Sequence, residues 1–322
     1  MNATNTASDL PKVAVVTPVY NGGAYLEETM ECVQAQTYPN LVHIVLNNAS
    51  TDNTAEILEK FKDAKVPVEV HVNDEVLNIN ANWNAAIALT PKDAKYIRFL
   101  CADDLMTPDF VEKTVTLAET DSDIQLVGTY VTKNEERMQF NWPGQAVVDG
   151  KEIARGFFKG EMGFFAIHSL MRADVLEWRN PLFDEIMLGM DFEAYVGILK
   201  RGKFGMIHED LGWVRVHEGS QTSTTMLKKN THFADWHTTL YRHGPDVFTP
   251  QEFSALARRY ELYYLGKCRG WRRMGGDDAI ALHYKTIAAN RGPVTTSDKV
   301  ASLMNGAMIK FGLRPGWPGW PN

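Results

Sequence analysis

Four short runs of β-branched and apolar residues, separated by segments with helical periodicity, constrain the fold of the first hundred residues. The runs are Val13–Thr17, Val42–Leu46, Val68–Val72 and Tyr96–Leu100. The first two are almost wholly apolar, as expected for strands that are buried on both faces of a parallel sheet. The alternation predicts an α/β fold with a doubly wound, mostly parallel sheet flanked by helices.

The segments between the first strands have the periodicity of amphipathic helices. Leu26, Met30 and Val33 repeat at i, i+4 and i+7, and Ile57 with Phe61 repeats at i and i+4. Similar patterns predict further elements along the chain. These are helices over Asn82–Leu89, Phe110–Ala118 and Asp191–Lys200, and strands over Ile124–Val131, Phe204–Ile207 and Gly212–Val216.

The chain changes character near residue 230. Phe253, Leu256, Tyr260 and Tyr263 repeat at i, i+3, i+7 and i+10, which indicates a long amphipathic helix. We therefore expect an α/β domain over residues 1–230 and a helical C-terminal extension over residues 231–322.

The composition of the 322 residues argues against some classes of partner. The 33 basic and 40 acidic residues give a net charge of −7, and a nucleic-acid-binding face would need clustered cations. Cys32, Cys101 and Cys268 lie far apart, so we expect free thiols in a reducing compartment. The first ten residues lack a signal-peptide pattern and no run of 18 apolar residues occurs, so we expect a cytoplasmic protein that does not span a membrane.

Polar residues follow each of the four predicted strands. Ligands of a doubly wound sheet bind beyond the carboxyl ends of its strands, so these residues predict a site for a polar ligand. They are Thr17-Pro18-Val19-Tyr20-Asn21, then Asn47-Asn48-Ala49-Ser50-Thr51-Asp52, then Asn73-Asp74, and finally Cys101-Ala102-Asp103-Asp104.

Of the four segments, the one after the fourth strand is the most acidic, because it contains the adjacent residues Asp103 and Asp104. The sequence has neither G-x-G-x-x-G nor the P-loop pattern, so a phosphate group must be held in another way. Adjacent carboxylates can recruit Mg²⁺ or Mn²⁺, whose preference for oxygen ligands suits a bridge to a diphosphate. The alternative is that the pair caps a helix beginning near Thr107-Pro108, and its place in the series of strand ends favours the metal site.

The order and spacing of these motifs resemble family 2 of the glycosyltransferases, which have the GT-A fold. The resemblance extends from Val13 to about Thr225. It rests on Thr17–Asn21, Asn47–Thr54, Asn84–Ala86, Asp103-Asp104, Gly189–Glu193, Trp213–His217 and Ser220–Thr222.

The resemblance implies an inverting glycosyltransferase of bacterial surface-polysaccharide type. It would move a sugar from a nucleotide-diphosphate donor, with a UDP-sugar favoured, to a hydroxyl of a saccharide or lipid-linked acceptor, with Mg²⁺ or Mn²⁺. Asp191 is the expected catalytic base, since it matches the family's acidic segment at a predicted helix start; Glu193 is the reserve. The expected metal ligands are Asp103, Asp104 and His217, and the expected sugar-nucleotide contacts are Thr17, Pro18, Tyr20, Asn21, Asn47, Ser50, Asn84, Ala102, Asp103, Arg215 and Ser220.

Two positions depart from the family pattern. Asn47 stands where the family usually has an Asp that contacts uracil, and an Asn still offers a carbonyl acceptor and an amide donor to a pyrimidine edge. Cys101 stands where a carboxylate often precedes the metal-binding Asp. Two alternatives therefore stay open, a catalytically silent nucleotide-sugar-binding or scaffold protein and a sugar nucleotidyltransferase. The second normally carries a basic, glycine-rich loop after the first strand, which Tyr20–Gly23 lacks.

The predicted C-terminal helix has a local excess of cations. A solvated face is one interpretation, and contact with an anionic membrane surface or a lipid-diphosphate acceptor is the other. Phe311, Trp317 and Trp320 could seat the extension on the inner face of the cytoplasmic membrane or pack in a homodimer contact. The cations are Arg258, Arg259, Lys267, Arg269, Arg272 and Arg273.

Overall fold

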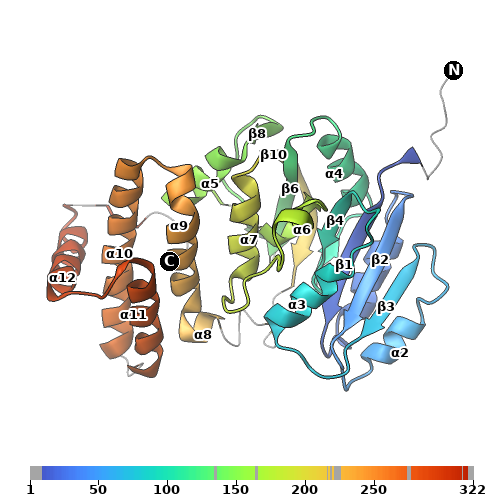
Figure 1. The fold of residues 1–322 in the computed structure, drawn as a ribbon, viewed down its shortest axis with the longest axis horizontal. Helices are drawn as coiled ribbons and strands as arrows, with labels where there is room; N and C mark the ends of the chain where they lie inside the picture. The colour runs from blue at the N-terminus through green and yellow to red at the C-terminus, as the bar shows by residue number, and fades with distance from the viewer. Residues whose placement is uncertain are drawn as a thin grey trace. The chain divides into compact units, whose positions relative to one another are not determined.

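The computed structural model describes residues 9–133, 136–163, 166–215, 217, 220, 226–273, 277–313 and 315–317 (Figure 1). The chain divides into two compact units. The first, here called the sheet unit, comprises Met1–Gly150, Phe164–Ile186 and Met190–Val216. The second, the helical unit, comprises Lys151–Gly163, Met187–Gly189 and His217–Asn322.

The sheet unit alternates strands and helices along its first half, as the periodicities predict. Its elements are β1 (Val13–Val19), α1 (Leu26–Gln34), β2 (Leu41–Asn47), α2 (Thr54–Glu59), β3 (Val68–Val72), α3 (Ile79–Ala88), β4 (Tyr96–Phe99), β5 (Leu105–Met106), α4 (Phe110–Ala118), β6 (Ile124–Lys133), β7 (Glu136–Arg137), β8 (Val147–Asp149), the 3₁₀ turn Ala166–His168, β9 (Ser169–Arg172), α6 (Val175–Trp178), α7 (Met190–Leu199) and β10 (Lys203–Val214).

The strands form one sheet in the order β3-β2-β1-β4-β9-β6-β10-β5. β1 pairs in parallel with β2 and β4, β2 pairs in parallel with β3, and β6 pairs in parallel with β10. Every residue of β1 and β2 is buried, as their apolar composition predicts. The prediction of an α/β sheet that is mostly parallel and flanked by helices is confirmed.

β9 is an antiparallel strand that the sequence analysis missed. It lies between β4 and β6 and pairs in antiparallel fashion with both. The single strand β10 covers the strand predicted over Phe204–Ile207 and the first three residues of the one predicted over Gly212–Val216, so the prediction of two separate strands was wrong. Arg215 follows the strand, and Val216 lies outside the described residues. Register shifts between Ile207 and Gly212 absorb the polar residues there, so pairing with β6 continues on both sides.

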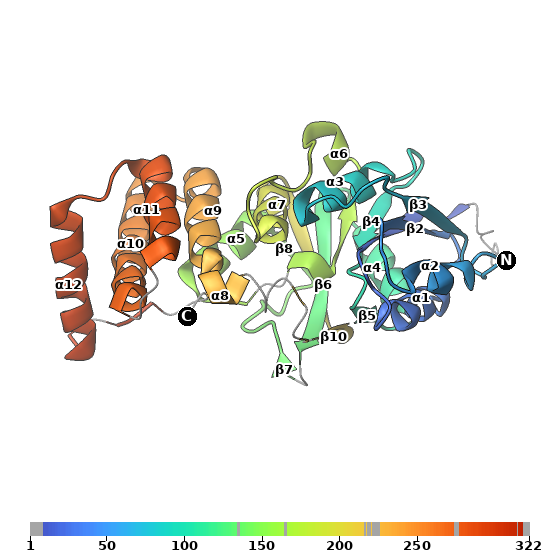
Figure 2. The same ribbon diagram turned by 90° about the horizontal axis from the view of Figure 1, so that it is seen from below.

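Helices cover both faces of the sheet. Figure 2 shows α3 on one face and α1 and α2 on the opposite one. Val13, Val15 and Val19 of β1 alternate with residues of the other face and pack in the clusters that also contain residues of α1 and α4. α3 begins at Ile79, three residues before the predicted start, because the Asn78 side chain accepts a hydrogen bond from the Ala81 N–H.

The helical unit contains the long helix that the C-terminal periodicity predicts. Its elements are α5 (Gly150–Lys159), α8 (Leu227–Lys229), α9 (Thr231–Val247), α10 (Pro250–Arg273), α11 (Asp277–Arg291) and α12 (Thr296–Lys310). Trp236 of α9 is buried among aromatic rings, including Phe157 and Tyr260. Among the described residues, no helix is both long enough and apolar enough to cross a membrane.

Candidate functional site

The loops that follow β1 and β2 are bonded to each other at the carboxyl end of the sheet. The Asn21 N–H donates to Ser50 Oγ at 2.9 Å, and the Thr51 N–H donates to Asn21 Oδ1 at 2.9 Å. Asn21 has a φ of +50°, a left-handed conformation that Asn tolerates better than most residues. The predicted contacts Asn21 and Ser50 are therefore brought together.

Two glycines tighten the same junction. The Gly22 N–H donates to Thr54 Oγ1 at 2.9 Å, and the Gly23 N–H donates to Asp52 Oδ2 at 2.8 Å. A Cβ on Gly23 would lie 1.9 Å from Asn53 Oδ1, so the two loops approach too closely for a side chain there. The Gly-Gly pair thus allows close loop contact, and it does not form a phosphate loop.

Asn47 lies at the end of β2 and is nearly buried. Its Oδ1 accepts a hydrogen bond from the Ser50 N–H at 2.9 Å, which closes a turn over the strand end. The neighbouring Asn48 donates to the Leu77 carbonyl and accepts from the Leu77 N–H, each at 2.9 Å. Asn47 keeps its place at the strand end, with one lone pair of its carbonyl oxygen already used.

Thr17 and Pro18 are buried in β1, and Tyr20 is exposed just beyond it. Thr17 Oγ1 lies 2.9 Å from His43 Nε2, so this hydroxyl faces the interior of the sheet unit. Burial lowers the pKa of His43 to about 3, which keeps the ring neutral. Of these predicted contacts, Tyr20 is the one whose side chain is open to a ligand.

Asn84 holds another segment of the sheet unit. Its Nδ2 donates to the Phe183 carbonyl and its Oδ1 accepts from the Phe183 N–H, each at 2.9 Å. Asn80 donates to the Asp184 carbonyl at 2.6 Å. Both ends of the Asn84 amide are thus engaged with backbone, and its predicted contact with a sugar nucleotide stays a prediction.

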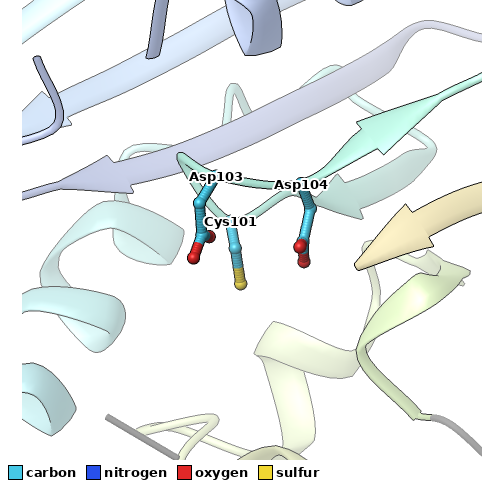
Figure 3. Close-up of side chains that lie close together, drawn as sticks. All are labelled: Cys101, Asp103 and Asp104. Carbon is cyan, nitrogen blue, oxygen red and sulfur yellow. The ribbon is translucent and has the colours of Figure 1, made fainter. Parts of the chain in front are cut away.

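The turn after β4 brings three side chains together. Figure 3 shows Cys101, Asp103 and Asp104 pointing to the same side of the turn, and their ligand atoms all lie within 4.8 Å of one another. The Asp104 N–H donates to the Cys101 carbonyl at 3.2 Å. Thr29 of α1 donates to the carbonyls of Ala102 and Asp104 at 3.0 and 3.1 Å, which fixes the turn against the helix.

This set of side chains fits a hard divalent cation through its two carboxylates. Burial, together with the charges of Asp104, Asp103 and Asp191, raises the pKa of the Cys101 thiol well above its usual value. Mg²⁺ and Mn²⁺ prefer oxygen ligands to sulfur. Asp103 and Asp104 are therefore the residues suited to hold such a cation.

A chain of buried polar side chains supports Asp104. His168 Nε2 lies 3.0 Å from Asp104 Oδ2, and Arg98 Nη2 lies 2.9 Å from His168 Nδ1. The exposed fractions are 4% for Asp104, 1% for His168 and 0% for Arg98. An arginine only donates, so His168 Nδ1 must accept and Nε2 must carry the proton that it donates to Asp104. Burial and the Arg98 charge lower the pKa of His168, in agreement with a neutral ring.

Backbone carbonyls and an aromatic ring hold the Arg98 side chain in place. Its Nη1 donates to the Phe99 and Ile167 carbonyls at 2.8 and 2.6 Å, and its guanidinium lies 4.8 Å from the centre of the Phe110 ring. Sequence analysis missed both Arg98 and His168. Arg98 could have been noticed as the one charged residue within the apolar run Tyr96–Leu100. His168 carries no comparable signal in the sequence.

Arg215, a predicted sugar-nucleotide contact, lies beside the same carboxylate. Its backbone N–H donates to Asp104 Oδ1 at 3.3 Å. Its guanidinium donates to Glu28 Oε2 at 2.5 Å and lies 5.2 Å from the centre of the Tyr25 ring. Each oxygen of Asp104 thus receives a hydrogen bond from the protein, one from His168 and one from Arg215.

Asp191 is the second residue of α7 and is partly buried. Burial raises its pKa, while the backbone N–H groups of Phe192 and of Asp191 itself oppose that shift. Its charge is one of the causes that raise the pKa of the Cys101 thiol in the turn after β4. Glu193 is fully buried and paired with Arg179, which removes the reserve base from any contact with an acceptor.

His217 and Ser220 fall in the helical unit. The Ser220 N–H donates to the His217 carbonyl at 3.2 Å. Gln221 and Thr222 lie outside the described residues. The role of His217 in metal binding and that of Ser220 in sugar-nucleotide binding stay predictions.

Comparisons with known proteins identify the family of the chain. A family model described as glycosyl transferase family 2 matches residues 14–178. An uncharacterized glycosyltransferase of Haemophilus influenzae is 32% identical over 222 residues, 66% of this chain and 68% of that protein. A hyaluronan synthase of Pasteurella multocida is 26% identical over 265 residues, which cover 78% of this chain but only 25% of the synthase.

Solved structures share the fold at low sequence identity. TarS of S. aureus, in complex with UDP-GlcNAc, has a TM-score of 0.67 and 13% identity, with 87% of this chain and 81% of that chain covered. A mannosyltransferase of Pyrobaculum calidifontis, in complex with GDP-Man and Mn²⁺, has a TM-score of 0.55 and 14% identity, with 96% and 82% covered. With the match to the family model over residues 14–178 of the 322, these findings show that the chain is a glycosyltransferase and belongs to glycosyl transferase family 2.

Proposed function

We propose that the chain transfers a sugar from a nucleotide-diphosphate donor to a hydroxyl of a saccharide or lipid-linked glycan, with inversion at the anomeric carbon. The observation that carries the proposal is the turn after β4, where the ligand atoms of Asp103 and Asp104 lie within 4.8 Å of each other. Asp191, at the start of α7, contributes to the raised pKa of the Cys101 thiol in the same turn. The proposed product is a bacterial surface polysaccharide, and the similarity to the hyaluronan synthase of Pasteurella multocida supports a polysaccharide in general.

The loops after β1 and β2 are the proposed seat of the nucleotide. They are bonded to each other through Asn21 and Ser50, so hydrogen bonds within the protein hold this edge of the sheet together. Asn47 can present its amide to a pyrimidine edge, which is compatible with the UDP-sugar that the family resemblance favours. The UDP-GlcNAc complex of TarS and the GDP-Man complex of the Pyrobaculum calidifontis mannosyltransferase support a nucleotide-sugar ligand in general.

Asp103 and Asp104 would hold Mg²⁺ or Mn²⁺. When bound, such a cation neutralises negative charge on the leaving nucleoside diphosphate. The protein's own contribution is to hold Asp104 still, through the His168 ring and the Arg215 N–H. A carboxylate fixed in this way does not have to reorient when the ligand binds.

Asp191 is the proposed base. It would accept the proton of the acceptor hydroxyl while that oxygen attacks the anomeric carbon opposite the leaving diphosphate, and this geometry inverts the anomeric centre. Burial raises the pKa of Asp191, which makes its carboxylate a stronger base than an exposed one. The start of α7 stabilises the anion that catalysis needs.

The proposal is tested by the release of nucleoside diphosphate from UDP-, GDP-, CDP- and dTDP-sugars in the presence of a panel of saccharide acceptors. We expect one nucleotide class to react, and only with Mn²⁺ or Mg²⁺ present. Asp103→Ala should lose metal-dependent binding of the sugar nucleotide, which thermal shift detects. If no nucleotide sugar stabilises the wild-type chain, the proposed seat of the nucleotide is wrong.

Asp191→Asn separates the base from the binding site. We expect the rate of transfer to fall by about 10²- to 10⁴-fold while the thermal shift with the sugar nucleotide stays as in the wild type. The wild-type kcat/KM should rise with pH on an acidic limb whose midpoint lies above about 3.9, the ordinary value for Asp, because its pKa is raised and the ionised form is the base. Transfer by Asp191→Asn at the wild-type rate would exclude this assignment.

A further inference from the structure

Helix α12 is oriented with its polar side inward. Its buried residues are Asp298, Ser302 and Asn305. On the other side, Val300, Leu303, Met304 and Ala307 follow one another at helical spacing, and Phe311 continues the row one turn later. We call these five residues the α12 face.

Specific hydrogen bonds hold the polar side in place. The Asp298 carboxylate accepts from Arg258 Nη1 at 2.6 Å and from Arg291 Nη1 at 3.2 Å, and it also caps the start of α12 through Thr295. Ser302 donates to the carbonyl of Leu262 in α10 at 2.6 Å. Because these buried polar groups have hydrogen-bond partners, the polar side of α12 forms a specific contact with α10 and α11.

The α12 face remains open to solvent among the described residues. The exposed fractions are 52% for Val300, 56% for Leu303, 61% for Met304 and 74% for Phe311. Leu313, just beyond the helix, is 73% exposed. Single apolar side chains scattered over a surface are common in soluble proteins. A contiguous row of large apolar side chains on an exposed helix instead indicates a contact surface. Figure 1 shows α12 packed beside α10 within the helical unit.

The charges around the α12 face indicate its partner. Lys299 and Lys310 are exposed on one flank of the face, near its two ends. From Lys299 to Leu313 the sequence has no Asp or Glu, and Asp298 is occupied by two arginines. An apolar row flanked by lysines and free of acidic groups suits an anionic lipid surface. In a two-fold dimer that packs this face with the helices antiparallel, Lys299 of one copy would approach Lys310 of the other, and their charges would repel.

Several of the residues that the sequence suggested for membrane contact are used elsewhere, whereas Phe311 belongs to the α12 face. Arg258 pairs with Asp298, Arg259 donates to the Gly316 carbonyl, and Arg269 donates to Ser302. Trp317 is buried and stacks on Tyr263, and Trp320 lies outside the described residues. The exposed apolar residues of the helical unit lie instead mainly on α12 and just after it.

We propose that the α12 face seats the chain on the surface of a bilayer that contains anionic lipids, without crossing it. The apolar row would enter the boundary between headgroups and acyl chains, and Lys299 and Lys310 would lie among the headgroups. The proposal adds a location, the membrane surface, to the proposed function. It does not depend on that function, since vesicle binding requires neither sugar nucleotide nor metal.

Vesicle sedimentation tests the proposal with the full chain. We expect the wild type to sediment with vesicles of phosphatidylcholine and phosphatidylglycerol, and to bind pure phosphatidylcholine vesicles less well. The double variant Leu303→Glu/Met304→Glu should lower the partition coefficient by about tenfold or more, because it places two carboxylates in the apolar row. Lys299→Gln/Lys310→Gln should weaken binding only to the anionic vesicles.

Leu282→Glu is the matched control. Leu282 is an exposed apolar residue of α11 outside the α12 face, so the same change of side chain there should leave binding unchanged. The proposal fails if the wild type does not bind anionic vesicles, or if Leu282→Glu weakens binding as much as the double variant. It also fails if light scattering shows a dimer that the double variant dissociates, since a second copy then covers the face. Thermal unfolding of each variant verifies that the helical unit is intact.

Discussion

Both oxygens of Asp104 are held by the protein, and each bond comes from a residue distant in sequence. His168 donates to one oxygen and the Arg215 N–H donates to the other. Arg98 leaves His168 one possible tautomer, because its guanidinium occupies the second ring nitrogen. The direction of the proposed metal ligand is therefore set by groups that need not touch the metal.

His168→Ala should raise the concentration of Mn²⁺ needed for half-maximal activity by about 10- to 100-fold, the usual cost of losing a group that orients a ligand. The substitution removes the hydrogen bond to Asp104 Oδ2 and leaves Arg98 Nη2 without its partner. A titration of activity with Mn²⁺ measures the effect. His168→Asn, which can still donate, should recover part of it. A lower melting temperature with an unchanged Mn²⁺ curve would mean that His168 serves the fold alone.

His43 should make the stability of the sheet unit depend on pH. Its pKa is lowered to about 3 by burial, whereas an unfolded chain would bind the same proton near pH 6.5. Between these values the unfolded state holds more protons, so stability falls as pH drops from about 6.5 toward 3, by up to about 1.4 kcal/mol per pH unit. Urea unfolding at several pH values in this range gives the free energy of unfolding of the wild type and of His43→Asn. We expect this free energy to change less with pH in the variant. Parallel slopes would contradict the assignment.

At the scale of elements, the sequence predicts best where a segment's environment follows from its own composition. β1 and β2 are uniformly apolar and lie in the buried centre of the sheet, and α4 has the predicted bounds. β9 has only four residues, Ser-Leu-Met-Arg, and no pattern of its own. It is a strand because β4 and β6 supply pairing partners on both sides, which composition alone does not reveal.

Asn84 joins α3 to the segment around Phe183, and its removal should destabilise the sheet unit. Asn84→Ala loses two hydrogen bonds and leaves the Phe183 N–H and carbonyl without partners, so we expect a loss of about 1–3 kcal/mol in the free energy of unfolding. Chemical denaturation measures it. Asn53→Ala is the control, since Asn53 caps α2 without a side-chain hydrogen bond and should cost less. Equal losses in the two variants would contradict the role of Asn84.

At the scale of the whole molecule, the candidate site divides into a part that the sequence reveals and a part that it does not. Asp103, Asp104 and the loop residues Asn21 and Ser50 were predictable, because each follows directly on a recognisable strand. The support of Asp104 was not, because 70 residues separate Arg98 from His168 and only the folded sheet brings them together.

The inward side of α12 has the same explanation. A polar row of Asp298, Ser302 and Asn305 is ordinarily assigned to solvent, and its burial depends on arginines and a carbonyl from α10 and α11. The apolar row opposite is then left outside. Periodicity locates two faces on a helix, but the partners decide which of them turns inward.

The two residues that donate hydrogen bonds to Asp104 lie next to β9 and β10, and this placement limits where the chain can be recombined with its relatives. His168 immediately precedes β9, and Arg215 immediately follows β10. Asp104 precedes His168 by 64 residues and Arg215 by 111 residues. A crossover placed anywhere between residues 105 and 167 would take Asp104 from one parent and both of its hydrogen-bond donors from the other. Chimeras joined there inherit an unmatched carboxylate, so working hybrids should cluster at junctions that keep residues 98–215 from one parent.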